Sequence, residues 1–432
     1  MIDQTIVLKI GVALALGLAG CVLVCWRRLF ELEARQFSTV IWTLMLASRL
    51  GGFITLFVIL GLEPRSDVQT YFFWSHLILD GHIPTHHADL PLHYGPAFLY
   101  ITTGALMLWD SAKCLVLVAI LFDLATFPLW LATARRAFDE TIVRRAAILY
   151  IFAPVPFGSI VISGQNHIWV GFLIALCFYL MGKNRVGAAA FAMGLSVVAV
   201  KFLNLLYMPI MAAQSRRWVT MGVGFLLPVV IAYGVAWYYN INPIDGILFH
   251  AEHFSSGTVP FLLTAFGWPM DGVIFSRTMK IISLLALASI FLPAWITGSL
   301  RREDAVILML SAITYTFLLV STKGFAGYAT MVFFPVCILF ALVRVRLFAL
   351  GVFVCYGVLA SIASSLWYRV ITARDMSFIV LDKSHGVPTM HLVVFMAVEV
   401  ALVACHAVLL WWSLRMLYGR QPTTSAEIPR SS

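Results

Sequence analysis

Long apolar runs separated by short polar clusters organise the whole chain. Apolar stretches of about 15 to 22 residues recur from Ile6 to Ser413, close to the roughly 20 residues that a helix needs to cross a bilayer. Short groups of arginine and lysine stand between them. The pattern predicts an all-α polytopic membrane protein.

The apolar runs predict about thirteen transmembrane helices. We expect them approximately at 5–26, 41–62, 113–133, 146–163, 167–182, 186–200, 202–214, 218–238, 279–299, 305–321, 327–343, 347–366 and 391–413. Two of these segments, 186–200 and 202–214, are too short to cross roughly 30 Å of hydrocarbon upright. We therefore expect two half-helices that meet at Lys201.

The composition excludes a soluble domain of useful size. The 432 residues are 61% hydrophobic and 11% charged, with a mean hydropathy of +0.94, so one transmembrane domain spanning 1–432 is expected. The seven cysteines fall in or beside apolar runs and indicate neither a disulfide framework nor a zinc site. The formal charge of +9 is spread over short loops, which argues against a nucleic-acid partner.

The basic residues predict the orientation of the chain in the membrane. If the N-terminus lies outside, most of the 29 lysines and arginines fall on one side, which is cytoplasmic by the positive-inside rule. Ten of the eleven histidines then lie outside or at the outer membrane edge, and only His406 does not. The large outer loops are 63–112, 239–278 and 367–390. We expect the polar chemistry on the extracytoplasmic face.

The first outer loop gathers an unusual set of polar side chains. It reads RSDVQTYFFWSHLILDGHIPTHHADLPLHYGP from Arg65 to Pro96. Ser66 followed by Gln69 has the pattern of a capping box, which predicts a helix that begins at Asp67 and that Gly81 can end. This helix is too short to span and should lie along the interface. Asp67 is either a carboxylate that favours the helix dipole or a general base at the membrane surface.

The loop histidines raise the question of a metal. His86 and His87 are adjacent, so they point in opposite directions in an extended loop, and no recognised ligand spacing surrounds them. We expect neither a metal site nor another cofactor. Solvated histidines, or donors to a sugar or a phosphate, fit the pattern better.

Three stretches in order resemble a known family. They are Asp67 with Tyr71, Gly81 and HYGPAFLY in the first outer loop, SGQNHIWVGFLIAL from Ser163 to Leu176, and GAAAFAMGLSVVAVKFLNLLYMP from Gly187 to Pro209. Together they resemble the GT-C glycosyltransferases, and most of all the bacterial branch of mannosyltransferases that use polyprenol-phosphate-mannose. The resemblance covers about residues 42–214, roughly 40% of the chain.

The resemblance implies a division of the single domain. Residues 1–40 are an extra N-terminal helix, retained because no small-residue cleavage site follows it, with a cytoplasmic loop. Residues 41–214 are a GT-C-like core with a catalytic outer loop at 63–112. Residues 215–413 are variable C-terminal helices, and 414–432 are a cytoplasmic tail.

The resemblance also implies a hexosyltransferase of the bacterial inner membrane. It would move a hexose, mannose first, from a polyprenyl-phosphate donor to a lipid or glycan acceptor, with inversion and with Asp67 as general base. The partners are this donor, the acceptor and membrane lipids. The candidate ligands of the donor phosphate are Lys201, Arg277, Lys323 and Arg369, where Lys201 ranks first because a lysine at membrane depth is functional by default. The candidate sugar or acceptor ligands are Tyr71, His86, His87, Tyr94, Gln165, Asn166 and His253.

We expect Arg49 and Asp123 to have a structural role and not a role in the active site. Counted at 1.5 Å per residue from the cytoplasmic ends of their helices, Arg49 lies about 12 Å deep and Asp123 about 15 Å deep. Both depths fall inside the hydrocarbon, so the two side chains could neutralise each other. We expect a packing pair.

Two other classes stay open. A flippase or transporter of lipid-linked sugars would place ionisable groups near the midplane between internal repeats, whereas most of them here crowd one face. A lipid-linked polysaccharide polymerase or ligase would also work outside, but it would need Arg369 and Arg374 more than Asp67.

Overall fold

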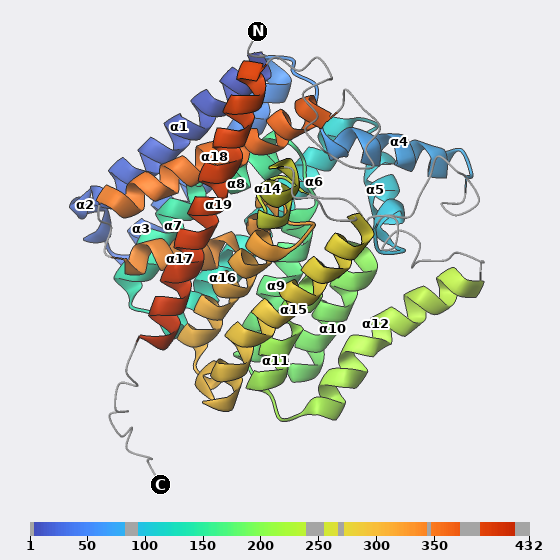
Figure 1. The fold of residues 1–432 in the computed structure, drawn as a ribbon, viewed down its shortest axis with the longest axis vertical. Helices are drawn as coiled ribbons and strands as arrows, with labels where there is room; N and C mark the ends of the chain where they lie inside the picture. Colours follow the sequence, from blue (N-terminus) through green and yellow to red (C-terminus); the bar gives the residue numbers. More distant parts are fainter. Residues whose placement is uncertain are drawn as a thin grey trace.

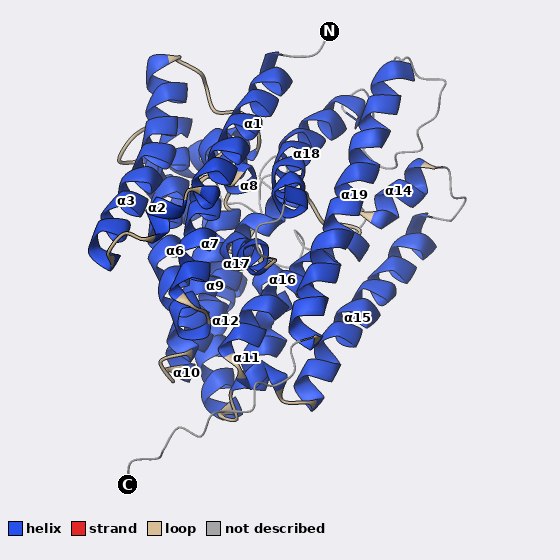
Figure 2. Cartoon of the chain, turned by 90° about the vertical axis from the view of Figure 1, so that its left-hand side faces the viewer, coloured by secondary structure: helices blue, strands red, loops and turns tan. Residues whose placement is uncertain are grey.

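The protein is built from helices throughout the part that the structure describes. The computed structural model describes residues 4–82, 94–238, 255–266, 272–343, 347–371 and 389–419, and these contain helices and connecting turns but no strand. Figure 2 shows this all-helical arrangement. The expected fold class, an all-α membrane protein, is confirmed.

The helices follow one another with short connections. The first half contains α1 (Gln4–Cys25), α2 (Arg27–Phe30), α3 (Ala34–Leu46) with the π-helical turns η1 (Ala47–Gly51) and η2 (Ile54–Ile59), α4 (Asp67–Leu79), α5 (Phe98–Leu106), α6 (Ala112–Ala137), α7 (Glu140–Ile151), α8 (Pro154–Phe157), η3 (Gly158–Ile162), α9 (His167–Met181), α10 (Val186–Ala199), η4 (Phe202–Tyr207) and α11 (Met208–Gln214). The second half contains α12 (Trp218–Tyr238), α14 (Val259–Ala265), α15 (Gly272–Ile296), η6 (Ser299–Arg301), α16 (Glu303–Val320), η7 (Ala326–Val332), α17 (Phe333–Leu342), α18 (Leu347–Ile371) and α19 (Thr389–Tyr418).

Each of the predicted transmembrane segments is helical in the structure. Among the described residues, eight helices are long and apolar enough to cross a membrane, and five shorter apolar helices accompany them. The segment expected at 41–62 begins earlier, at Ala34, and the one expected at 146–163 begins at Glu140. The break expected at Lys201 is present, because α10 ends at Ala199 and η4 begins at Phe202.

Small residues let the helices approach closely. A Cβ on Gly194 of α10 would lie 2.2 Å from the carbonyl oxygen of Phe225 in α12, and one on Gly224 would lie 2.5 Å from that of Gly187. Only glycine permits these backbone contacts. In Figure 1, α12 runs beside α10 and α1 runs beside α18.

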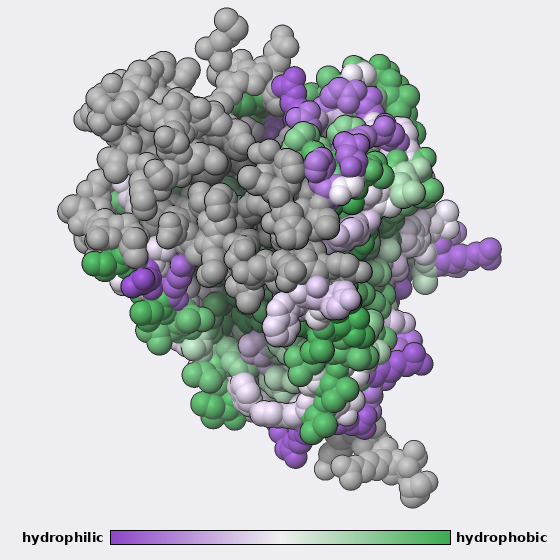
Figure 3. Space-filling model, turned by 90° about the vertical axis from the view of Figure 1, so that its right-hand side faces the viewer, coloured by the Kyte–Doolittle hydropathy of each residue, from purple (hydrophilic) through white to green (hydrophobic). Residues whose placement is uncertain are grey.

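Much of the described surface is apolar. In the view from the right of Figure 1, apolar surface covers large areas of the described part (Figure 3). On α12, Val219 is 82% exposed and Trp237 is 80% exposed. A surface of this kind suits contact with lipid chains.

The predicted pair of Arg49 and Asp123 is present in the core. Arg49 Nε donates to Asp123 Oδ2 at 2.6 Å, and both side chains are fully buried. Arg49 also donates to the carbonyl oxygen of Ile151 at 2.9 Å, and the Tyr150 hydroxyl donates to the other Asp123 oxygen. The pair therefore joins the α3–η1 segment, α6 and α7, which is a structural role.

Candidate active site

The helix that carries Asp67 begins with a strained residue. As predicted, α4 begins at Asp67, and it ends at Leu79 before Gly81, whose φ is +87°. The expected capping box does not form: Ser66 has φ +88° and its side chain caps nothing. Its hydroxyl instead accepts a hydrogen bond of 3.1 Å from Gln165 Nε2. This tertiary bond competes with the local cap, and it joins the first outer loop to the turn before α9.

Two tyrosines extend from Asp67 into the protein. The Tyr71 hydroxyl lies one helical turn along α4 and donates to Asp67 Oδ2 at 3.5 Å. The Tyr94 hydroxyl donates to the Tyr71 hydroxyl at 3.0 Å. Burial raises the pKa of both tyrosines well above 10, and the Asp67 carboxylate raises it further. Both phenols therefore stay protonated at neutral pH and can act as donors.

The end of α10 holds Tyr94 in place. The Gly95 amide donates to the Val200 carbonyl at 2.9 Å, and the Ala97 amide donates to the Val198 carbonyl at 3.1 Å. A Cβ on Gly95 would lie 2.1 Å from the Val198 oxygen, so only glycine allows this approach. The returning arm of the first outer loop is thereby fixed against the residues that precede Lys201.

Lys201 lies in the break between α10 and η4, among aromatic rings. Its Nζ is 5.0 Å from the ring centroid of Tyr94, 5.5 Å from that of Tyr328 and 3.4 Å from His167 Nδ1. Cations are attracted to such ring faces. Burial lowers the pKa of the Lys201 ammonium to about 8, while the Asp67 carboxylate acts in the opposite direction. Asp67 and Lys201, far apart in the sequence, thus belong to one electrostatic cluster.

Lys323 adds a second ammonium group to this cluster. It lies in the turn between α16 and η7 and is half-buried. Burial, and to a smaller extent repulsion by Lys201, lower the pKa of its ammonium to about 7. An anion placed between two such groups would offset both effects.

The structure adds two residues that the sequence interpretation missed. His167, the first residue of α9, packs edge-on against Tyr328 of η7 at a centroid distance of 4.6 Å, and both border Lys201. His167 directly follows the Gly-Gln-Asn turn, and this position in the sequence could have identified it as a site residue. For Tyr328 the sequence contains no signal, since only tertiary packing brings η7 to α9.

The predicted polar ligands Gln165 and Asn166 lie at the same turn. Gln165 Oε1 and both polar side-chain atoms of Asn166 are buried and have no hydrogen-bond partner among the described residues. Asn166 is 1% exposed. Buried amides without partners are costly, so this turn is suited to a polar ligand.

The remaining predicted site residues are not brought into the cluster by the described structure. Arg277 is exposed on α15. His86, His87 and His253 lie outside the described residues, as does the side chain of Arg369 on α18.

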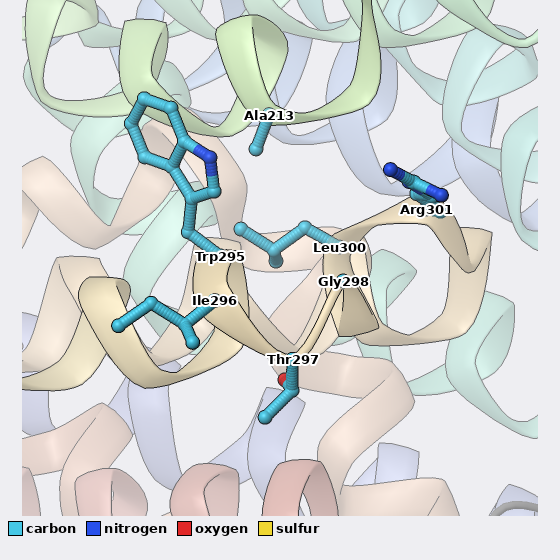
Figure 4. Close-up of a pocket in the computed structure, with 7 residues that line it drawn as sticks. All are labelled: Ala213, Trp295, Ile296, Thr297, Gly298, Leu300 and Arg301. Carbon is cyan, nitrogen blue, oxygen red and sulfur yellow. The ribbon is translucent and has the colours of Figure 1, made fainter.

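Two surface cavities lie elsewhere, at basic ends of helices. One of about 300 Å³ is bordered by α11, the end of α15 and η6, as Figure 4 shows for Ala213, Trp295 and Arg301. The other, of about 350 Å³, lies at Arg135–Asp139 and Ile142. Both adjoin clusters that the charge pattern predicts to be cytoplasmic, and none of their lining residues belongs to the Asp67–Lys201 cluster.

Comparison with known proteins finds a distant likeness among solved structures. No protein-family profile and no curated protein matches the chain. Among solved structures, the crystal structure of ArnT from Cupriavidus metallidurans bound to undecaprenyl phosphate is similar with a TM-score of 0.49 and 17% identity, over 89% of this chain and 77% of that chain. Likeness of this degree does not establish a family or an activity. In the residues that it describes, the structure is an all-helical membrane protein with a carboxylate, two tyrosines and two lysines gathered at one site.

Proposed function

We propose that the chain is a membrane glycosyltransferase of the GT-C type that uses a polyprenyl-phosphate sugar. The transferred group is a hexose, mannose first, and the acceptor is a lipid or a glycan. One observation carries the proposal: Asp67 and Lys201 come from separate segments and meet through Tyr71 and Tyr94. Transfer of a sugar from a sugar phosphate requires a base for the acceptor proton and a fixed cation for the departing phosphate, and both are present in this site.

The reaction would proceed in a single displacement. An acceptor hydroxyl would transfer its proton to Asp67 as its oxygen attacks the anomeric carbon of the sugar. The bond between that carbon and the phosphate oxygen breaks, and the electron pair stays on the departing polyprenyl phosphate. Attack from the face opposite the leaving group inverts the anomeric centre.

The lysines would stabilise the leaving group. The phosphate oxygen gains negative charge as the bond breaks, and fixed positive charge lowers the energy of that transition state. Lys201 and Lys323 are half-buried and act on each other electrostatically, which supports their assignment to the phosphate. The tyrosine hydroxyls would keep the Asp67 carboxylate oriented toward the acceptor.

The proposed site faces the extracytoplasmic side of a bacterial inner membrane. The charge pattern supports this orientation, because the basic clusters at Arg135–Arg145 and at Arg301 and Arg302 belong to the opposite helix ends from Asp67. A polyprenyl-phosphate donor would enter from the bilayer beside α4, whose aromatic residues suit the interface.

The test is transfer of labelled sugar by the purified protein in membranes. Wild type is compared with Asp67→Asn at equal expression, using polyprenyl-phosphate-mannose first and other hexoses next. We expect a loss of about three orders of magnitude or more in kcat with donor binding retained, since a general base contributes 10² to 10⁴. Asp80→Asn, an exposed carboxylate at the other end of the same helix, is the matched control.

Two results would contradict the proposal. Full activity in Asp67→Asn would remove this carboxylate as the base. Absence of transfer by wild type from every polyprenyl-phosphate hexose would favour a polymerase or a flippase instead.

A further inference from the structure

Ser66 holds a backbone conformation that serine rarely adopts. Its φ is +88° and its ψ is −158°, in a region of backbone space that is essentially restricted to glycine. The other non-glycine residue with positive φ in the described part of the chain is Asn184, whose φ of +58° lies in the left-handed helical region that asparagine tolerates. Ser66 directly precedes the proposed base Asp67, so this strained residue sets the direction in which α4 begins.

A side chain from a distant segment holds Ser66. Gln165 Nε2 donates to the Ser66 hydroxyl at 3.1 Å. Among the described residues, the Ser66 side chain forms no other hydrogen bond. A glycine could adopt the same φ without strain, but it could not accept this hydrogen bond. The serine therefore couples the start of α4 to the turn before α9.

The turn that carries Gln165 has a fixed place in the protein. The Gln165 amide donates to the Ser159 carbonyl at 2.8 Å. Gly164 has a φ of +56°, and a Cβ there would lie 3.0 Å from Cγ2 of Val68 in α4 and 3.0 Å from Cγ2 of Val116 in α6. The turn thus packs directly on the first turn of α4, and the Gln165 side chain extends from an anchored backbone.

The position of Asp67 depends on how the chain enters α4. The Tyr71 hydroxyl belongs to the same helix, and at 3.5 Å its hydrogen bond to Asp67 is long, so it orients the carboxylate only weakly. If Ser66 relaxed to a negative φ, the chain would enter α4 from another direction. Asp67 would move with it, because it is the first residue of the helix.

We propose that Gln165 is a positioning residue: its hydrogen bond holds Ser66 in the strained conformation that places the Asp67 carboxylate for catalysis. This inference rests on the proposed function. It gives Gln165 a role that acts through Ser66, in place of the expected contact with the sugar or the acceptor.

The test combines Gln165→Ala with Ser66→Gly. Glycine adopts a positive φ without help from a hydrogen bond, so the double variant can regain the wild-type start of α4. Transfer of labelled hexose and the melting temperature are measured for the full-length protein in lipid nanodiscs. The matched control is Gln69→Ala, because Gln69 is exposed on the same helix and its side chain forms no hydrogen bond with the described residues.

We expect Gln165→Ala to lower kcat by about tenfold or more with little change in the KM for the donor, since a shift of about 1 Å in a reacting group can cost about a hundredfold. Ser66→Gly alone and Gln69→Ala should stay close to wild type. The double variant should recover most of the lost kcat, at a melting temperature close to that of wild type.

Amide hydrogen exchange across residues 66–71 gives a second readout that does not depend on transfer. The Gln69 amide donates to the Ser66 carbonyl at 3.0 Å, so it reports on the start of α4. Exchange should be faster in Gln165→Ala and should return toward the wild-type rate in the double variant.

The outcomes separate this inference from the proposed function. Unchanged kcat in Gln165→Ala would show that the hydrogen bond positions nothing. A loss of kcat or a rise in KM that Ser66→Gly does not reverse would assign Gln165 to substrate contact instead. Either result overturns the positioning role and leaves the proposed function intact, whereas absence of transfer by wild type would overturn both.

Discussion

The Glu399 carboxylate in α19 accepts a hydrogen bond of 2.5 Å from the backbone amide of Gly257. The same carboxylate accepts one of 2.5 Å from the Ser256 hydroxyl, and Glu399 is fully buried. In the turn that Glu399 holds, the Ser255 amide donates a hydrogen bond of 2.8 Å to the Thr322 carbonyl. Thr322 is the residue that precedes Lys323. A buried acid in α19 therefore fixes the backbone that carries a proposed phosphate ligand.

Replacing Glu399 with alanine should destabilise the protein and loosen that turn. Two buried donors lose their acceptor, at about 1–3 kcal/mol each, so we expect a lower melting temperature and weaker binding of undecaprenyl phosphate. Differential scanning fluorimetry in detergent measures the first effect. Glu63→Ala is the control, because Glu63 forms an exposed ion pair with Lys113 that contributes little. Equal melting temperatures for the two variants would contradict the assignment.

The lysine pair predicts a pH dependence of phosphate binding. Both pKa values are lowered in the folded protein, to about 8 for Lys201 and about 7 for Lys323. Only the protonated ammonium attracts phosphate, so affinity falls as the pH rises through these values. A phosphate monoester gains its second charge near pH 6, which places the optimum between about 6 and 7.

Titration of the protein in nanodiscs with undecaprenyl phosphate at pH 6.5 and pH 9 measures this effect. We expect a loss of about tenfold or more at pH 9, since each neutralised ammonium removes a charged hydrogen-bond donor. In Lys323→Met, affinity should be lower throughout and should fall only through the pKa of Lys201. Equal affinity at both pH values would exclude the two lysines as phosphate ligands.

Gly95→Ala should disrupt the site because the added methyl group clashes with the backbone of α10. Its Cβ would lie 2.1 Å from the Val198 carbonyl oxygen and 2.4 Å from the carbonyl carbon, and these backbone atoms cannot move without breaking the pairing that positions Tyr94. We expect transfer activity to fall by about two orders of magnitude or more, as misplacement of a reacting group by 1 Å can do. Gly104→Ala in α5, with no atom within 4 Å, should keep wild-type activity.

The buried pair of Arg49 and Asp123 predicts strongly non-additive stability. Removing one partner, as in Arg49→Met, leaves the other charge unpaired and should cost about 3–5 kcal/mol. The double variant Arg49→Met, Asp123→Leu should recover much of that loss, because an apolar pair of similar volume needs no partner. Thermal unfolding of the single and double variants measures the coupling. Additive losses would show that the two side chains act independently.

Local pattern was sufficient for the helices and for part of the site. The apolar runs predicted the helical segments because helices in lipid must satisfy their own backbone, so composition and length decide them. The break at Lys201 was predicted because the two apolar runs beside it are too short to cross the membrane. The pairing of Arg49 with Asp123 was predicted because both side chains lie inside the hydrocarbon. These features depend on neighbours along the chain or on the bilayer.

Tertiary structure decided which side chains meet. The Ser66 hydroxyl accepts a hydrogen bond from the Gln165 side chain instead of capping α4, so a long-range partner replaces the expected partner within the helix. His167 and Tyr328 reach Lys201 only because η7 packs on α9. The sequence by itself determined the helices and the residue types available for chemistry, because those depend on local hydrophobicity and charge. Their distances, burial and pKa values depend on contacts between segments far apart in the chain, and only the packed structure supplies these.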